Sequence, residues 1–436
     1  MVRVTLRFAS VAALLAACGF QPGLAGGVDG SFEGGDGGSG THDAGADSDS
    51  GVVLSGRCSS PGAFRDDFSI ALATNFTGHW IVGANATVSG GTFSVTPLSA
   101  TAFAGILAKH AIDITGANVS VEVPAMIANA NATAGLFLYS GDLVHYLAIY
   151  QQQGMLVAEY NLGAGPQRTK IAYDGTLQRF WRIAEANGQI TFQYSADNAT
   201  WTTFGPATTT PVFATELQIV LGGLSYDNQT HGTAQFDNLN TSAEPAAWCK
   251  ANTFVDRFAR TAIGFDWTRR LNPTNGNGCT PTVTTGAHFD QASNTNAGRC
   301  WLSTQKAFDL KDSSAMIDVV PAASPPAGWS VFLRAVNDDL DAFYIQFEAQ
   351  GQICSQVKSN AAVCVPYVAG STFYRLREAN STLFFETSPD ATAWSVVSQV
   401  VTPFSLASTH FEIGTATTNS IGAAQPLTVS LFNATP

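Results

Sequence analysis

The chain has 436 residues, a length that fits two domains of about 180 to 200 residues with additional segments. Only 12% of the residues are charged, and the formal net charge of −12 excludes a basic nucleic-acid-binding protein, which needs an excess of cations. Seven cysteines, together with abundant Thr, Asn and Ser, are typical of an exported β protein.

The N-terminal residues, 1–18, have the features of a signal peptide. Arg3 and Arg7 precede a mostly apolar stretch at 8–17 that is too short to cross a bilayer. The sequence Leu-Ala-Ala-Cys-Gly that follows at 15–19 resembles a bacterial lipobox. This resemblance implies that Cys18 carries lipid chains and anchors the protein to a membrane, at the outer membrane or cell surface. The alternative is ordinary secretion, in which Cys18 has no special role.

Residues 19–57 are predicted to form a flexible tether. Twelve glycines lie between positions 23 and 56, and the acidic side chains of this segment face a single base, Arg57. A Gly-rich chain with charges of one sign is flexible and extended, so it cannot form a core.

An internal repeat organises the rest of the chain. Residues 180–187 (FWRIAEAN) recur as residues 373–380 (FYRLREAN), an offset of 193, and residues 146–154 match residues 343–351 at an offset of 197. The repeat predicts two domains, at 58–246 and 249–436, with short insertions in their loops.

Each copy is predicted to be all-β. Residues 119–123 and 190–194 alternate apolar and polar side chains, which is the pattern of a half-buried strand, and Asn-Gly and Ser-x-Asp turns separate such segments. No long segment has helical periodicity with suitable caps. Many short strands at regular spacing predict two tandem antiparallel jelly-roll β-sandwiches.

Several short motifs resemble one family. Each copy opens with Phe-x-Asp-x-Phe, has a Trp about a dozen residues later, and contains an aromatic-aromatic-Arg strand followed by a Ser-x-Asp turn and Trp201 or Trp394. Together they resemble the bacterial concanavalin A-like lectin/glucanase domains, which are laminin G-like jelly rolls. The resemblance covers both copies and implies a sandwich fold, a grooved sheet face suited to sugars, and in some members a calcium ion at a rim loop.

Four aromatic residues are candidates for ligand binding because the motifs single them out: Trp80, Trp181, Trp267 and Tyr374. A large aromatic ring in a strand stacks on a sugar when it is exposed, and fixes the packing of the sheet when it is buried. Core packing is the favoured interpretation.

The six cysteines that remain after Cys18 are predicted to form disulfide bonds. Cys354 and Cys364 flank a predicted hairpin turn, and Cys279 and Cys300 bracket a segment rich in Thr, Asn and Gly. This leaves Cys58 and Cys249, which bracket the first domain. No CxxC or HxxxH pattern favours zinc over these bonds.

No catalytic residues are predicted. The sugar-cleaving members of the resembled fold use a Glu-x-Asp-x-x-Glu strand, whereas Glu122 and Asp318 are single acids at predicted solvent-facing strand positions. Retaining hydrolysis needs two carboxylates, so one acid is insufficient. An enzyme is therefore not expected, with a glycan-acting enzyme as the alternative.

The resemblance also implies a candidate calcium site in the second copy, at Asp338, Asp339 and Asp341, because carboxylates are the ligands of this hard cation. A solvated turn is the alternative, and no other cofactor is expected. The sequence as a whole predicts a lipid-anchored envelope protein for binding or adhesion. Glycan is the first ligand considered, and a protein-interaction or structural envelope module is the other alternative.

Overall fold

The computed structural model describes residues 57–434, except for 71–75, 78, 84, 99–102, 128–130, 206, 228, 230, 272–280, 291–297, 321–326, 349–350, 359, 419–420 and 422–424. The signal peptide, Cys18 and all of the predicted tether except Arg57 lie outside the described residues. The described chain consists of antiparallel strands and three short 3₁₀ turns, η1 (Pro61–Ala63), η2 (Val212–Thr215) and η3 (Ala251–Thr253). Within it, no helix is long and apolar enough to cross a membrane. The predicted all-β fold is confirmed.

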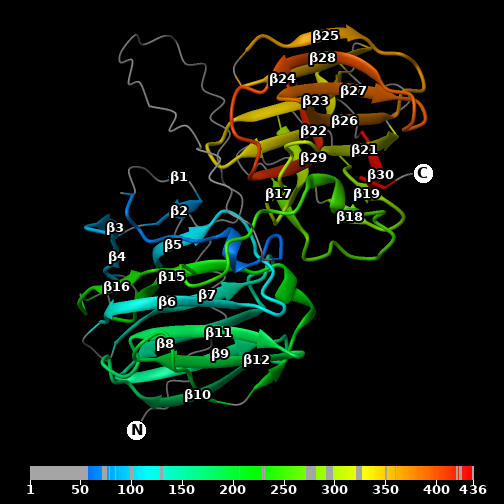
Figure 1. Cartoon of the computed structure of the whole chain (residues 1–436). Helices are drawn as coiled ribbons and strands as arrows, with labels where there is room; N and C mark the ends of the chain where they lie inside the picture. The colour runs from blue at the N-terminus through cyan, green and yellow to red at the C-terminus, as the bar shows by residue number, and fades with distance from the viewer. Residues whose placement is uncertain are drawn as a thin grey trace.

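Two sheets form a first sandwich (Figure 1). Sheet I has the order β1 (Phe76–Thr77), β2 (Trp80–Val82), β5 (Ala104–Ala108), β15 (Gln218–Ser225), β7 (Ala132–Tyr139), β8 (Tyr146–Gln152), β9 (Met155–Asn161), β10 (Pro166–Ala172). Sheet II has the order β13 (Thr202–Thr203), β12 (Gln189–Ser195), β11 (Phe180–Ala186), β6 (Asn118–Ala125), β16 (Ala234–Asp237), β4 (Thr92–Val95), β3 (Ala86–Ser89), and β14 (Thr208–Thr209) pairs with β12. One apolar core lies between the two sheets.

Two further sheets form a second sandwich with its own core (Figure 1). Sheet III has the order β17 (Trp267–Leu271), β20 (Gly298–Thr304), β29 (Thr409–Thr417), β22 (Trp329–Asn337), β23 (Ala342–Glu348), β24 (Gln352–Val357), β25 (Val363–Pro366). Sheet IV has the order β18 (Thr282–Val283), β19 (Ala287–His288), β30 (Thr428–Phe432), β21 (Ser314–Val320), β26 (Phe373–Ala379), β27 (Thr382–Ser388), β28 (Ser395–Val401). The domain limits deduced from the repeat remain a prediction.

The repeated motif builds the same hairpin in sheets II and IV. Trp181 and Tyr374 point into the two cores, where both are fully buried, and the arginine that follows each points to the outer face. There, Arg182 lies 3.9 Å from the ring centre of Trp201, and Arg375 lies 3.8 Å from that of Trp394. Successive side chains of a strand point to opposite faces, so the core aromatic ring and the arginine that follows it lie on opposite sides of the sheet.

One sequence match is wrong by one residue. The core side chains Leu147 and Ile149 of β8 correspond to Phe343 and Ile345 of β23, an offset of 196 rather than 197. The reason is turn length: two residues separate the paired ends of β8 and β9, whereas three separate those of β23 and β24. Because side chains alternate between faces, this shift assigns every residue of the strand to the opposite face.

The structure contains two of the predicted disulfide bonds. Cys58 is bonded to Cys249, and Cys354 is bonded to Cys364 across the β24–β25 hairpin. Cys300 is also disulfide-bonded, but its predicted partner, Cys279, lies outside the described residues. Such bonds are typical of an exported protein.

Removing each described bond should destabilise the protein, and the loss should rise with the logarithm of the length of the loop that the bond closes. The Cys58→Ser/Cys249→Ser variant opens a loop of 191 residues and should lose about 5 kcal/mol of unfolding free energy. The Cys354→Ser/Cys364→Ser variant opens a loop of 10 residues and should lose about 3 kcal/mol. Guanidinium denaturation of the two variants measures both values, and a larger loss in the second variant would contradict this order.

Candidate functional site

The outer face of sheet I carries a second cluster of buried side chains, separate from the core. Its members come from β5 and the residue before it, β7, β8, β9 and β15, and five of them are aromatic: Phe103, Phe137, Tyr139, Tyr146 and Tyr150. They reach this face because they alternate in sequence with core residues; Tyr146 and Tyr150, for example, flank Leu147 and Ile149. We call this surface the tyrosine face.

A buried carboxylate lies among these rings. Glu159 of β9 is 1% exposed, and it accepts hydrogen bonds from the hydroxyl groups of Tyr146 at 2.6 Å and Tyr150 at 2.5 Å. Arg168 of β10, opposite Glu159 in the sheet, lies 3.0 Å from the same carboxylate through its Nε atom. Three donors therefore compensate for the loss of water around the buried charge.

The electrostatics keep the tyrosines as donors. Burial raises the pKa of Tyr139, Tyr146 and Tyr150 well above the usual range, and the negative charge of Glu159 raises it further. The hydroxyl groups stay protonated at any physiological pH. At the margin of the face, the partly exposed Tyr226 lies 2.6 Å from Thr133 Oγ1 and accepts a hydrogen bond from Gln152.

The second sandwich lacks this arrangement. With the corrected register, Tyr146, Tyr150 and Glu159 correspond to Ala342, Gln346 and Gln356. The fold therefore does not require the tyrosine face, because its partner copy keeps the same strands without these side chains. The sequence analysis missed this site. Its signal was the alternation of tyrosines with Leu and Ile at 146–150, which the one-residue error in the match concealed.

The four aromatic residues predicted as ligand-binding candidates lie in the two cores, which agrees with the core-packing interpretation. Trp80, Trp181, Trp267 and Tyr374 are between 0% and 3% exposed. The indole nitrogens of Trp80 and Trp267 donate to Asp66 and Asp256, the aspartates of the opening motif. The rings are thus fixed inside the protein, and they leave no surface for a ligand.

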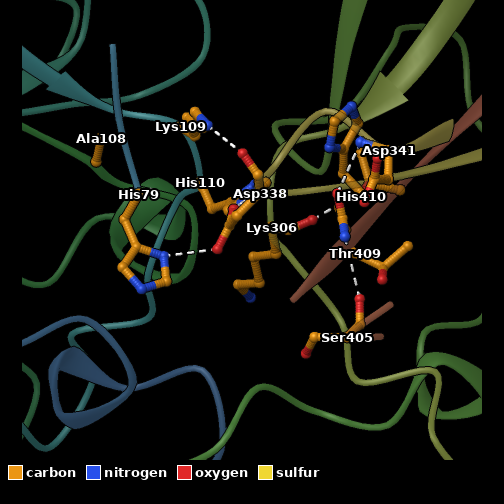
Figure 2. A network of polar contacts seen from close by, with 12 residues as sticks. His79, Ala108, Lys109, His110, Lys306, Asp338, Asp341, Ser405, Thr409 and His410 are labelled. Atoms are coloured by element: carbon orange, nitrogen blue, oxygen red, sulfur yellow. Dashed lines mark hydrogen bonds and ion pairs between the residues drawn. The ribbon is translucent and has the colours of Figure 1, made fainter. Parts of the chain in front are cut away.

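The candidate calcium loop instead joins the two sandwiches (Figure 2). Asp338, just after β22, lies 2.6 Å from His110 Nε2 through Oδ1 and 2.6 Å from His79 Nδ1 through Oδ2. Lys109 donates to the backbone carbonyl of Asp338. Figure 2 shows His79 and Lys109 of the first sandwich both directed at this residue.

These contacts do not fit calcium. The cation needs six to eight oxygen ligands, whereas both carboxylate oxygens of Asp338 are held by imidazole rings and Asp341 pairs with Lys358 at 2.9 Å. Asp339 is exposed. Among the described residues, no group of three acidic, histidine or cysteine side chains is arranged to hold a metal ion. Calcium binding by this loop therefore stays a prediction that these contacts do not support.

At this junction both histidines favour the charged form of Asp338, and Asp338 favours the charged form of His79. Burial opposes the charged form of Asp338, but His110 and His79 outweigh it and hold the pKa of this carboxyl well below its usual range. Burial also opposes the charged form of His79, yet Asp338 and the nearby Asp66 raise its pKa. A second contact joins the sandwiches where Lys306 lies 2.5 Å from the buried Glu216.

The acidic residues considered for hydrolysis, Glu122 and Asp318, lie on sheets II and IV and not on the tyrosine face. Glu122, predicted to face solvent, is 7% exposed because Arg179 and Asn238 bind its carboxylate on the outer face of sheet II. Asp237 lies opposite Glu122 in the sheet, and burial together with the charge of Glu122 raises its pKa. Asp318 accepts a hydrogen bond from Ser430.

No known family profile matches this chain, and no curated protein matches it. Solved structures to which it is similar include an apo Crh5 transglycosylase (15% identity, 41% of this chain and 82% of the other, TM-score 0.33) and a Bacillus licheniformis β-glucanase (10%, 41% and 95%, 0.32). A laminarinase from Flavobacterium sp. UMI-01 has 9% identity over 41% of this chain and 97% of the other, with a TM-score of 0.32. At these values no function is inferred from the similarity.

The contact between His79 and Asp338 should make stability depend on pH. A histidine whose pKa is raised on folding stabilises the protein below its unfolded pKa of about 6.5, and this contribution is lost as the pH rises through the folded pKa. His79→Asn should therefore lower Tm at pH 6 and change it less at pH 9. The effect at pH 6 should be roughly 1 kcal/mol or less, because His79 is partly exposed.

Thermal unfolding of the variant and the parent at both pH values measures this difference. Asp338→Asn serves as the comparison, since it removes the partner of both histidines and should abolish the pH dependence that His79 contributes. A larger loss from His79→Asn at pH 9 than at pH 6 would contradict the assignment.

Proposed function

We propose that this protein is an exported, lipid-anchored binding protein whose first sandwich binds carbohydrate on the tyrosine face without cleaving it. Cys18 supplies the membrane anchor in this proposal, and residues 19–57 form the tether that holds the sandwiches away from the outer membrane or cell surface. The disulfide bonds are consistent with an exported protein.

One observation carries the proposal. The first sandwich has a buried carboxylate, Glu159, that is bound by two tyrosines and an arginine and surrounded by aromatic rings, and the second sandwich has no such group at the corresponding position. Aromatic rings with a few fixed polar groups are the usual lining of small-molecule sites. The rings of the tyrosine face are 1% to 8% exposed, so a ligand would contact the partly exposed polar groups above them rather than the ring faces. Sugar hydroxyl groups pair with such charged and amide side chains.

The polar groups at the margin of the face are the ones that a sugar would contact first. The side chain of Arg168 is 31% exposed, and Gln152 and Tyr226, which are hydrogen-bonded to each other, are also partly exposed. The ion pair with Glu159 fixes the guanidinium of Arg168 in position, so its positive charge is presented at a defined place at the margin of the face. Glu159 itself fixes the positions of Arg168 and the tyrosines from beneath.

The same contacts argue against catalysis on this face. The carboxylate of Glu159 is saturated by donors, and retaining hydrolysis needs a second carboxylate about 5 Å away. The glycan-acting enzyme remains the second candidate because Glu122 and Asp237 are cross-strand neighbours on sheet II, with the pKa of Asp237 raised. Cross-strand neighbours have Cβ atoms about 4.5 to 5.5 Å apart.

A glycan array probed with the full chain tests the proposal, and the variants Arg168→Ala and Tyr226→Ala locate the site. Arg168→Ala should weaken binding about tenfold or more, since losing a hydrogen bond to a charged group costs about 1.5 to 3 kcal/mol. Tyr226→Ala should weaken it about two- to tenfold, since a hydrogen bond between neutral groups contributes about 0.5 to 1.5 kcal/mol. Tyr344→Ala is the matched control, because this tyrosine lies on the corresponding face of the second sandwich, next to Gln356. It should leave binding unchanged.

The absence of binding to any glycan, or equal loss in the Tyr344→Ala control, would contradict the proposal. Release of reducing ends from a bound glycan, abolished by Asp237→Asn, would establish the enzyme instead.

A further inference from the structure

The segment that follows β20 in the second sandwich is inserted into the first. The backbone N–H of Ala111 donates to the carbonyl of Gln305 at 2.8 Å, and Ala111 pairs with Lys306 in a parallel bridge. The next residue, Ala307, is fully buried and belongs to the core of the first sandwich. The backbone of Lys306 is therefore fixed against the first sandwich on both sides of this residue.

The amino group of Lys306 meets a carboxyl group of the first sandwich. Its Nζ atom lies 2.5 Å from Oε1 of Glu216, and the two side chains are 17% and 4% exposed. The backbone N–H of Glu216 donates to the carbonyl of Phe213 in η2, and the ring of Phe213 lies 6.0 Å from that of Phe265 of the second sandwich. An amine and a carboxyl group are thus held in contact at a place that water reaches little.

A second carboxyl group, that of Asp266, lies beside Glu216. Among the described residues, none donates a hydrogen bond to the other oxygen of Glu216, Oε2, which is buried. Two carboxyl groups hydrogen-bond to each other only when one of them is protonated. Burial raises the pKa of Glu216 well above its usual value, and the charge of Asp266 adds to this although Lys306 opposes it. Glu216 therefore carries the proton, and a protonated carboxyl group is the form that an amine attacks.

The equivalent position in the first sandwich makes a contact of the same kind with a different side chain. Residues 307–310 match residues 111–114 in the repeat, so Lys306 corresponds to His110. His110 also reaches across the junction to an acid of the other sandwich, Asp338. An imidazole forms no lasting amide with a carboxyl group. The second copy thus places a nucleophilic amine where the first copy has a side chain that can only dock.

We infer that Lys306 and Glu216 form an intramolecular isopeptide bond, which joins the two sandwiches covalently. The ammonium group of Lys306 gives one proton to the Asp266 carboxylate by way of the Glu216 carboxyl group, which contacts both. The neutral Nζ then attacks Cδ of Glu216, and a second proton from the nitrogen leaves with the hydroxyl group as water. One C–N bond forms, one C–O bond breaks, and Asp266 ends as a neutral acid.

The reaction needs no oxidant, reductant or further reactant. Contact between the two groups supplies the high effective concentration that a condensation requires. Exclusion of water from the site opposes the reverse reaction, which is hydrolysis of the amide.

Peptide mapping of the full chain by tandem mass spectrometry, after reduction and digestion, tests this inference. The peptides that contain Glu216 and Lys306 should be recovered joined, with a mass lower than their sum by one water molecule. Lys306→Arg keeps the positive charge and should leave the two peptides separate. In samples taken at intervals after synthesis, Asp266→Asn should form the bond about a hundredfold more slowly, because it lacks the group that takes the proton.

Lys250→Arg is the matched control. Lys250 also pairs with a carboxylate, that of Asp309 at 2.6 Å, but its side chain is 45% exposed, so this variant should keep the bond between Lys306 and Glu216. Recovery of the two peptides only as separate species from the parent would overturn the inference, and this result does not depend on the folding of any variant. So would a bond from Lys306 to another residue, or formation of the bond in Asp266→Asn at the rate of the parent.

Discussion

A buried carboxylate must be given partners, and the need to compensate Glu159 organises the most distinctive surface of this protein. Its charge would be costly at 1% exposure without donors, and two neighbouring strands supply them: β8 through two tyrosines and β10 through Arg168. The tyrosine rings then pack on each other, with Phe137 and Tyr150 stacked at 5.8 Å and Tyr139 and Tyr146 at 5.4 Å. One charge thereby fixes an aromatic surface on a sheet that otherwise needs only its core face.

Comparison of the two copies separates what the fold needs from what it does not. Both keep the core aromatic at Trp181 and Tyr374, and both keep an arginine stacked on a tryptophan outside. They differ at the tyrosine face, at the edge beside β12 and β27, and at the loop after β22. The first of these differences is the candidate sugar site and the third is the junction between the sandwiches, so function is sought where the repeat has diverged.

Local patterns in the sequence were enough to predict the strands and the Cys354–Cys364 bond, and elimination left Cys58 and Cys249 as a pair. The alternation around Trp181 predicts which side chain enters the core, and the hairpin predicts that Cys354 meets Cys364. Contacts between distant residues were beyond such patterns. Asp338 is 228 positions from His110, so nothing near it in sequence distinguishes an aspartate that joins two sandwiches from one that binds calcium. Glu159 was missed because its partners come from neighbouring strands and one inserted turn residue hid their register.

Hydrogen–deuterium exchange of the full chain, with and without the oligosaccharide bound most tightly on the array, tests the central claim most directly. The account predicts that the ligand slows exchange in β7 to β10 of the first sandwich and leaves β22 to β25 of the second unchanged. Protection confined to the second sandwich, or to the outer face of sheet II around Glu122, would contradict the assignment of the tyrosine face as the binding site.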